Sequence, residues 1–369
     1  MTKLNKLEVF LIEHIKAHGS IPLGAFMTHA LCHPSYGYYQ ERDPFGVDGD
    51  FITAPEVSQM FGEVIGAWVV DTWFQMGKPE RFNLIECGPG RGTLMKDALR
   101  GVSKVHDFMD AVNINLVENS RTLRKKQEES LKEYNVKWWD DVAEIQGDIP
   151  VIIIGNEFLD ALPVEHLMRT DCGWQQKDIR LKEGGGFSFG WSNASEDLMS
   201  LLPDKTISHE IYEVSPARYE FTTQCARSIS ANGGAALLVD YGYTSLCKGD
   251  TVQAIQDHEY ASVLSHVGQC DITAHVDFCA VLSAAKSMNC CTFPVINQGQ
   301  FLCDIGMQHR AENLKKCAEE ACPADQKEKI VQDITTSFHR LTSSSEMGSL
   351  FKVCCFYQGF DFNAAGFCA

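Results

Sequence analysis

The segment "FNLIECGPGRGTLMKD", residues 82–97, joins an apolar run to a glycine-rich turn and then to a helix-like stretch. The apolar run ends in Glu86, and three glycines follow at every second position, Gly88, Gly90 and Gly92. A nearly continuous apolar run is typical of a strand in a parallel sheet that is covered on both faces. Glycine at the end of such a strand lets the backbone adopt positive φ angles and approach a ligand closely. The segment therefore predicts a strand, a ligand-binding loop and a helix whose N-terminus faces the ligand.

Four further apolar runs continue this pattern along the chain. Residues 112–117, 134–139, 150–154 and 234–239 are expected to be strands, and helix-like segments connect the earlier ones. Strands that alternate with helices in this way indicate a doubly wound α/β sheet. Residues 164–215 break the rhythm and indicate an antiparallel ribbon inserted between the last two strands.

The segments around this pattern define the expected domains. Residues 1–80 begin with an amphipathic helix pattern, contain a second helix at about 56–77, and are expected to form an N-terminal helical extension over the site. Residues 81–369 are expected to form the α/β core. This core carries the inserted ribbon at about 164–215 and a C-terminal elaboration at about 250–369.

Composition narrows the classes of partner. The formal net charge is −17, and binding to phosphate backbones needs a basic surface, so nucleic acid is excluded as a partner. No apolar run approaches the ~20 residues needed to span a bilayer. The N-terminus has no signal-peptide core and carries Glu8 and Glu13, which favours a cytoplasmic protein without a transit peptide. The 15 cysteines include no C-x-x-C pair, and no His, Cys and Asp cluster has metal-binding spacing, so no metal site is expected.

Three classes of ligand bind to a glycine loop that follows a first strand. A nucleoside triphosphate loop needs a lysine after its last glycine, but Gly92 is followed directly by Thr93. A dinucleotide fingerprint is G-x-G-x-x-G, whereas the spacing here is G-x-G-x-G. An S-adenosylmethionine (SAM) loop has an acid before glycines at this spacing, and a second acid after strand two that can accept both ribose hydroxyls. Glu86 and Glu118 are placed for these two roles. The alternative is a tight turn with Glu118 as an unrelated surface residue.

Several longer motifs make a family resemblance specific. Together they resemble the MidA-type family, which includes the mitochondrial complex I assembly-factor methyltransferases, and they span residues 5–358. In chain order they are "SYGYY" (35–39), "GDFITAPEVSQMFGE" (49–63), "ECGPGRGTL" (86–94), "NEFLDALPV" (156–164), "VDYGY" (239–243) and "DITAHVDF" (271–278).

The resemblance implies a class I SAM-dependent methyltransferase fold. It also implies protein-arginine methylation linked to assembly of a respiratory complex, as described for the mitochondrial branch. Cys87 stands where the family often has leucine, which is a loss of volume and not of a ligand. Arg91 is either a clamp for the cofactor carboxylate or a surface side chain, because SAM carries no phosphate. Carried onto this chain, the cofactor loop comprises Gly88, Pro89, Gly90, Arg91, Gly92 and Thr93.

Methyl transfer from a sulfonium needs a positioned nucleophile and an acceptor for its proton. A guanidinium nucleophile also needs carboxylates, which hold it in bidentate geometry. Asn156, Glu157 and Asp160 follow strand 150–154, at the edge of the sheet where ligands bind, and are the expected catalytic residues. The alternative for Asn156 and Asp160 is that they cap a turn before Pro163.

Three residues farther along the chain are expected to bind the substrate. Asp240 and Tyr241 end the fifth strand and face the same crevice, although Asp240 could instead form an Asx-type turn before Gly242. His275 is the third, with a surface position on a helix capped by Thr273 as the alternative.

Two further residues are expected at the cofactor. Asp140 ends the third strand, near the expected place of adenine, but it could equally start a helix. Thr53 precedes the helix at about 56–77 and is expected to close over SAM as part of a lid. The alternative is a capping box formed by Thr53 and Glu56, and both could hold.

The leading hypothesis is a SAM-dependent protein methyltransferase that acts on arginine, with Glu157 orienting the guanidinium. The expected partner is a protein substrate, with a subunit of a respiratory complex as the candidate, and a homodimer remains open. The alternatives are a SAM-binding assembly chaperone that works by protein–protein contact, and a methyltransferase for small molecules.

Overall fold

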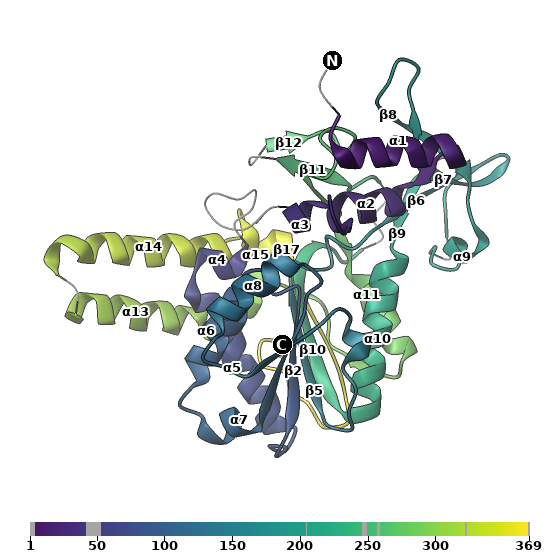
Figure 1. Ribbon diagram of the computed structural model, residues 1–369. Coiled ribbons are helices and arrows are strands. Elements are labelled where there is room, and N and C mark those ends of the chain that lie inside the picture. The colour runs from purple at the N-terminus through teal and green to yellow at the C-terminus, as the bar shows by residue number, and fades with distance from the viewer. Residues whose placement is uncertain are drawn as a thin grey trace.

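The computed structural model describes residues 4–41, 53–203, 205–245, 249–256, 259–321 and 323–367. Figure 1 shows a twisted sheet with helices on both faces, a smaller antiparallel layer beside it, and two long helices that project together from the body. The functional residues lie where the large sheet meets the smaller layer, so these two parts are described first.

The large sheet has the order β15-β17-β10-β5-β2-β3-β4, with β14 paired to β10 and β16 paired to β17. The strands β4, β3, β2, β5 and β10 are parallel, whereas β17 is antiparallel to β10. This arrangement confirms the predicted doubly wound sheet. The bounds are β2 Phe82–Cys87, β3 Val112–Val117, β4 Val136–Trp139, β5 Val151–Asn156, β10 Gly234–Tyr243, β14 Val276–Asp277, β15 Cys291–Thr292, β16 Ile296–Asn297 and β17 Phe351–Gln358.

The continuous apolar strands are explained by burial on both faces. In β2, Leu84 belongs to one hydrophobic cluster and Ile85 to the cluster on the opposite face, and Ile152 and Ile153 of β5 divide in the same way. On the first face lie α5 (Gln59–Gln75), α6 (Thr93–Val102), α7 (His106–Ala111), α12 (Gln298–Asp304) and α13 (Met307–Ala321). On the second face lie η1 (Val142–Glu144), α10 (Pro216–Asn232) and α11 (Phe278–Ser287), while α8 (Arg121–Ser130) connects β3 to β4.

The single helix expected at about 56–77 is two helices, α4 (Ala54–Val57) and α5. The chain breaks at Ser58, which has an extended backbone and whose side chain accepts a hydrogen bond from Met60 N. An N-cap of this kind starts a new helix. Because the helix is interrupted here, α4 does not continue the axis of α5. It lies instead against the glycine loop.

The smaller layer confirms the predicted antiparallel ribbon and adds the N-terminus to it. β1 pairs with β7, so the N-terminal helices pack on this sheet and share its hydrophobic cluster. Its sheet has the order β1-β7-β6-β9, β8 pairs with β7, and a three-stranded sheet β12-β11-β13 lies nearby. The bounds are α1 Lys6–His18, β1 Ile21–Pro22, α2 Leu23–Cys32, α3 Tyr38–Glu41, β6 Glu165–Thr170, β7 Gly173–Leu181, β8 Phe187–Asn193, α9 Glu196–Met199, β9 Ile211–Val214, β11 Gln253–Gln256, β12 Glu259–Ala261 and β13 Asp271–Thr273.

The projecting pair in Figure 1 is formed by α13 and α14 (Ala324–Thr342), and α15 (Met347–Leu350) leads from it into β17. Its base is tied to α5 by Arg310, whose Nε lies 2.7 Å from Glu63 Oε2 and whose terminal nitrogen lies 2.9 Å from Glu63 Oε1. Across the described ranges, none of the helices combines the length and apolar character that crossing a membrane requires.

Candidate active site

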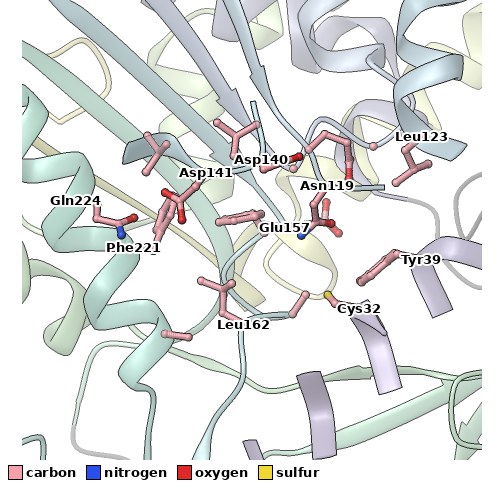
Figure 2. Close-up of a pocket in the computed structure, with 18 of the residues that line it drawn as sticks. Cys32, Tyr39, Asn119, Leu123, Asp140, Asp141, Glu157, Leu162, Phe221 and Gln224 are labelled. Atoms are coloured by element: carbon pink, nitrogen blue, oxygen red, sulfur yellow. The ribbon is translucent and has the colours of Figure 1, made fainter. Parts of the chain in front are cut away.

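A cavity of about 360 Å³ opens at the carboxyl ends of β2, β3 and β5. This edge is where an open α/β sheet binds ligands, because the strand order reverses on either side of β2. Figure 2 shows that Phe221 and Gln224 of α10 approach the cavity from one side, and Cys32 and Tyr39 from the other. Its lining residues include Gly88, Gly90, Glu118, Asn119, Asp140, Asp141, Val142, Glu157 and Phe158.

The glycine loop has the backbone that its spacing predicts. Gly88, Gly90 and Gly92 have φ angles of 66°, 54° and 79°, in the left-handed region that favours glycine. A Cβ atom at Gly88 would lie 2.6 Å from Phe158 Cδ2, so glycine there lets the loop after β2 approach the loop after β5. Gln127 Nε2 donates to Gly90 O at 2.8 Å and holds the loop from α8.

Glu86, the acid before the glycines, does not line the cavity. Its side chain is buried at the end of β2, and burial raises its pKa to about 8, partly offset by a hydrogen bond from the Met95 backbone. Its Oε2 atom has no partner among the described residues. Glu86 therefore joins β2 to the first turn of α6 from beneath the loop, and burial favours its neutral form near pH 7.

Glu118 directly follows β3, lines the cavity and is 9% exposed, so the alternative of an unrelated surface residue is wrong. Its Oε1 accepts from Ser120 N at 2.7 Å and its Oε2 accepts from Gln127 Nε2 at 3.2 Å. Burial is the main cause that raises its pKa to about 7. A carboxylate has about four lone-pair positions, so Glu118 keeps room to accept further hydroxyl groups.

Asp140 and Asp141 follow β4, and both line the cavity. The carboxylate of Asp140 is 70% exposed and accepts from a terminal nitrogen of Arg124 at 2.6 Å. Asp141 is the residue that starts the following 3-10 helix, since its side chain accepts from Ala143 N at 2.8 Å. The cap role considered for Asp140 therefore belongs to its neighbour.

Glu157 lies at the cavity in a strained conformation. Its φ angle is 51°, which costs about 1–3 kcal/mol for a residue other than glycine and is often found at functional sites. Its Oε1 accepts from Ala54 N at 2.8 Å and from Asn156 Nδ2 at 3.0 Å. Burial is the main cause that raises its pKa to about 7, with the nearby Asp160 adding to the shift.

Asn156 precedes Glu157 and Asp160 lies three residues after it, but neither is among the residues that line the cavity. Asn156 donates to Glu157, and its own Oδ1 is buried without a partner among the described residues. Burial raises the pKa of Asp160, opposed by hydrogen bonds from the Tyr241 hydroxyl and the Ala161 backbone. The turn-capping role considered for Asp160 stays an alternative prediction beside its contact with Tyr241.

None of the three residues expected at the substrate is among the residues that line the cavity. Asp240 is 1% exposed, and its oxygens accept from the backbone N–H groups of Leu159, Asp160 and Tyr241. It forms no Asx-type turn, because β10 runs on through Tyr243. Tyr241 is half-buried between Phe351 of β17 and the loop before α11, where its ring meets His275 with centroids 5.2 Å apart.

His275 is half-buried against Tyr241, and burial lowers its pKa. Its backbone N–H donates to Thr251 Oγ1 at 2.9 Å. The helix after it is capped by Asp277, whose side chain accepts from Cys279 N and Ala280 N. The cap proposed at Thr273 is wrong, because Thr273 lies in β13.

The helix α4 bridges the glycine loop and Glu157. Thr93 Oγ1 donates to Glu56 Oε1 at 2.6 Å, and a guanidinium nitrogen of Arg91 lies 3.9 Å from Glu56 Oε2. Arg91 and Thr93 therefore face α4, and neither lines the cavity. Thr53 precedes α4 without a side-chain cap bond, so the capping box with Glu56 is absent. The loop 42–52, which the lid hypothesis includes, lies outside the described residues.

Several lining residues were not predicted from the sequence. Cys32 and Tyr39 come from the N-terminal layer, and Ala217, Glu220, Phe221 and Gln224 come from α10. The Tyr39 backbone oxygen accepts from Ser120 Oγ at 2.7 Å, which fixes the N-terminal layer next to Glu118. The only signal for Tyr39 was its place in the motif "SYGYY", and α10 had none. In the part of the chain that the structure describes, no group of three His, Cys, Asp or Glu residues could hold a metal ion.

The fold and site define an α/β protein that binds a small ligand against a glycine loop and a buried acid. Residues 64–296 match the model of a family described as "Putative S-adenosyl-L-methionine-dependent methyltransferase". The chain belongs to this family, and its cofactor is S-adenosyl-L-methionine. Its activity is SAM-dependent methyl transfer.

The chain is 32% identical to "Protein arginine methyltransferase NDUFAF7 homolog, mitochondrial" of Drosophila melanogaster, over 94% of this chain and 83% of the relative. It is 30% identical to "Protein arginine methyltransferase NDUFAF7, mitochondrial" of Mus musculus, over 92% of this chain and 82% of the relative. A crystal structure of a Burkholderia thailandensis protein bound to S-adenosyl-homocysteine superposes with a TM-score of 0.82 at 24% identity, covering 98% of this chain and 93% of that one. This similarity confirms the class I methyltransferase fold.

The two relatives named above are called mitochondrial, and the expected cytoplasmic location finds no support among them.

The residues of the cavity fit this cofactor. The volume of about 360 Å³ falls in the range of small-molecule sites, roughly 300–1,000 Å³. Glu118 keeps acceptor positions for ribose hydroxyls, and the glycine backbone lines the cavity beside it. The five acidic side chains of the lining, with no Lys or Arg among the lining residues, suit a ligand with net positive charge: Glu118, Asp140, Asp141, Glu157 and Glu220.

Proposed function

We propose that this protein methylates arginine side chains of a protein substrate, and that Glu157 holds the guanidinium. The bound cofactor supplies an activated methyl group on a sulfonium. The protein must therefore orient the attacking nitrogen and take up its proton, and positioning accounts for much of such catalysis. The arginine specificity rests on the printed names of relatives at 30–32% identity and on the chemistry of the Glu157 side chain.

The observation that carries the proposal is the pair of unused acceptors at the end of β5. Both described hydrogen bonds to Glu157 reach Oε1, from Ala54 and Asn156, and they leave Oε2 available. The neighbouring Asn156 Oδ1 is buried and has no partner among the described residues. A guanidinium presents several N–H donors in one plane and satisfies adjacent acceptors better than a point-like ammonium does.

We assign Glu157 and Asn156 to the substrate, with Asp160 behind them as a second carboxylate. Near pH 7 the Glu157 carboxyl has a pKa close to the ambient pH because of its burial. A cationic guanidinium would favour its ionised form, and the same carboxylate would then accept the proton that methylation releases.

We assign the cofactor to the residues that line the cavity. Glu118 accepts the ribose hydroxyls, Gly88 and Gly90 allow close approach of the backbone, and Asp140 faces the base.

Gly92 and Thr93 support the loop from its helix side, and Arg91 acts through α4. We further propose that α4, with Thr53 at its start, serves as part of a lid, because it contacts both the loop and Glu157.

The partner follows from the family resemblance and the charge. We propose a protein substrate with exposed arginine, drawn to a chain of net charge −17, and a respiratory complex subunit as the candidate. A homodimer is compatible with this function, and gel filtration with light scattering measures it directly.

The test is incubation of a cell lysate with SAM carrying a labelled methyl group, followed by separation of proteins from small molecules. The proposal predicts label in one or a few proteins, and no label when Glu157→Gln replaces the native protein. Label in small metabolites alone would instead identify a small-molecule methyltransferase. SAM binding without any label, together with assembly that survives Glu157→Gln in cells, would identify a chaperone.

A further inference from the structure

Two buried charged residues hold the loop that carries Glu157, and neither lines the cavity. The loop is residues 157–160, between the end of β5 and the turn before β6, and is called the β5 loop below. Asp240 of β10 contacts its N–H groups, and Arg218 of α10 contacts its carbonyl groups. The backbone of this loop is thus held by hydrogen bonds from two different elements. These bonds from Asp240 and Arg218 are together called the grip on the β5 loop.

Asp240 fixes the N–H groups. Its Oδ2 accepts from Leu159 N at 2.8 Å and from Asp160 N at 3.1 Å, while its Oδ1 accepts from Tyr241 N at 2.8 Å. Both carboxylate oxygens are therefore occupied by backbone donors. A buried carboxylate in this position orients two consecutive peptide groups of the β5 loop.

Arg218 fixes the carbonyl groups. Its Nε donates to Leu159 O at 2.7 Å, and one terminal nitrogen donates to Ala274 O at 2.8 Å and to Asp160 O at 3.3 Å. The other terminal nitrogen donates to His275 O at 2.7 Å. Arg218 is 6% exposed, and none of the described carboxylates lies within salt-bridge distance of its guanidinium. Its planar fork of donors serves four backbone oxygens from two segments, which a lysine ammonium cannot do.

We propose that Arg218 and Asp240 are positioning residues for methyl transfer, and that their grip on the β5 loop places Glu157 at the cofactor cavity. The inference rests on the proposed role of Glu157. Glu157 lies two residues before Leu159 and has a positive φ angle of 51°. A strained residue keeps such a conformation only where its surroundings hold it, and the bonds at Leu159 and Asp160 do so.

The helix that provides Arg218 also forms a wall of the cavity. Phe221, three residues after Arg218, lines the cavity and packs on Phe158 of the β5 loop with ring centroids 4.8 Å apart. Phe158 in turn lies where a Cβ at Gly88 would be. Phe158 therefore links the β5 loop to the cavity wall and to the glycine turn.

The test uses Arg218→Lys and Asp240→Asn in the full chain, with Arg227→Lys as the control on an exposed site of the same helix. The rate is transfer of labelled methyl from saturating SAM into lysate protein, and the Kd for SAM is measured by calorimetry. We expect the two variants to lower the rate by about tenfold or more, with Kd changed by less than about threefold. Glu118, the residue assigned to the ribose, is held by hydrogen bonds from Ser120 and Gln127, and neither Arg218 nor Asp240 takes part in them.

The pH profile separates positioning from a loss of stability. Glu157 faces Asp160, Asp240 and Arg340, and its burial is the main cause of its raised pKa. Release of the β5 loop should hydrate Glu157, so the midpoint of the rate profile should move from near 7 toward the ordinary value of glutamate. The control should leave rate, Kd and midpoint unchanged.

Rates within twofold of native and an unmoved midpoint in both variants would overturn the inference, provided that Glu157→Gln is inactive. Native activity in Glu157→Gln would instead overturn the proposed function, and with it the basis of the inference. If the variants fail to fold, hydrogen exchange of the native protein decides. Slow exchange at the Leu159 and Asp160 amides supports the grip, and exchange at the rate of exposed loops contradicts it.

Discussion

At the scale of single residues, the site is defined by carboxyl groups that burial drives toward their neutral form. Glu86 lies near the end of β2, and Glu118 and Glu157 directly follow β3 and β5. Burial raises their pKa values to about 8, about 7 and about 7. Their roles differ because their neighbours differ. Glu86 is closed off beneath the loop, Glu118 is held open to the cavity by Ser120 and Gln127, and Glu157 is held by Ala54 and Asn156.

Glu157 predicts the pH dependence of the reaction. The ionised carboxylate is needed to hold a guanidinium, so kcat/KM should rise with pH through about 7, the pKa of Glu157 in the free enzyme. This step in the pH profile is measured from initial rates between pH 5.5 and 9. The substrate is the protein that gains label in the lysate experiment. Glu157→Gln should lower kcat by about 100-fold or more and remove the step. A step of unchanged midpoint in that variant would assign the titration to another group.

Glu86 predicts the pH dependence of stability. Its pKa is raised in the folded state, so the folded protein binds more protons than the unfolded chain between about 4.5 and 8. The stabilisation of the neutral form is complete below the unfolded pKa and is lost as pH rises through about 8, at up to about 1.4 kcal/mol per pH unit. The melting temperature should therefore fall between pH 6 and 8.5, and Glu86→Gln should flatten this fall. An equal slope in both proteins would contradict the assignment.

At the scale of elements, the strand–loop–helix unit around Gly90 could be predicted because each of its signals is local. A strand buried on both faces needs a continuous apolar run, and the glycines supply positive φ angles in the turn. Glu118 and Glu157 could also be predicted, because parallel strands end at one edge of a sheet.

The rest of the site depends on tertiary contacts that leave no local signal. The division of α4 from α5 rests on one cap at Ser58. The spacing of apolar residues on both sides of Ser58 still fits a single helix, so it does not indicate the break. Cys32 and Tyr39 reach the cavity from the N-terminal layer because β1 pairs with β7, a partner more than 150 residues away. Asp240 was expected at the substrate, but its partners are backbone amides of a loop about 80 residues earlier.

The glycine loop predicts a selective loss of cofactor affinity. Gly90→Val places a β-branched residue at a φ angle of 54°, where strain of about 1–3 kcal/mol is expected, next to the cavity. Calorimetric titration with SAM should give a Kd about 10- to 100-fold higher. The control is Gly184→Val, with a φ angle of 92° in an open turn of the antiparallel layer, which should keep the native Kd. Equal loss in both variants would point to general destabilisation.

At the scale of the whole molecule, two layers meet at the cavity. The large sheet supplies the glycine loop and the acids, and the N-terminal layer supplies the opposite side through Cys32 and Tyr39. The Tyr39 backbone is hydrogen-bonded to Ser120, two residues beyond Glu118, so the two layers are joined beside the cavity. The cavity is therefore a product of both layers, and neither would enclose it alone.

The central claim is that this molecule transfers a methyl group from SAM to arginine in a protein. The most direct measurement is mass spectrometry of the lysate proteins that gain label, with the modified residue assigned by fragmentation. The account predicts methylarginine when the native protein is added, and none with Glu157→Gln. Label on lysine, histidine or a protein terminus, or methylarginine at equal yield with Glu157→Gln, would contradict it.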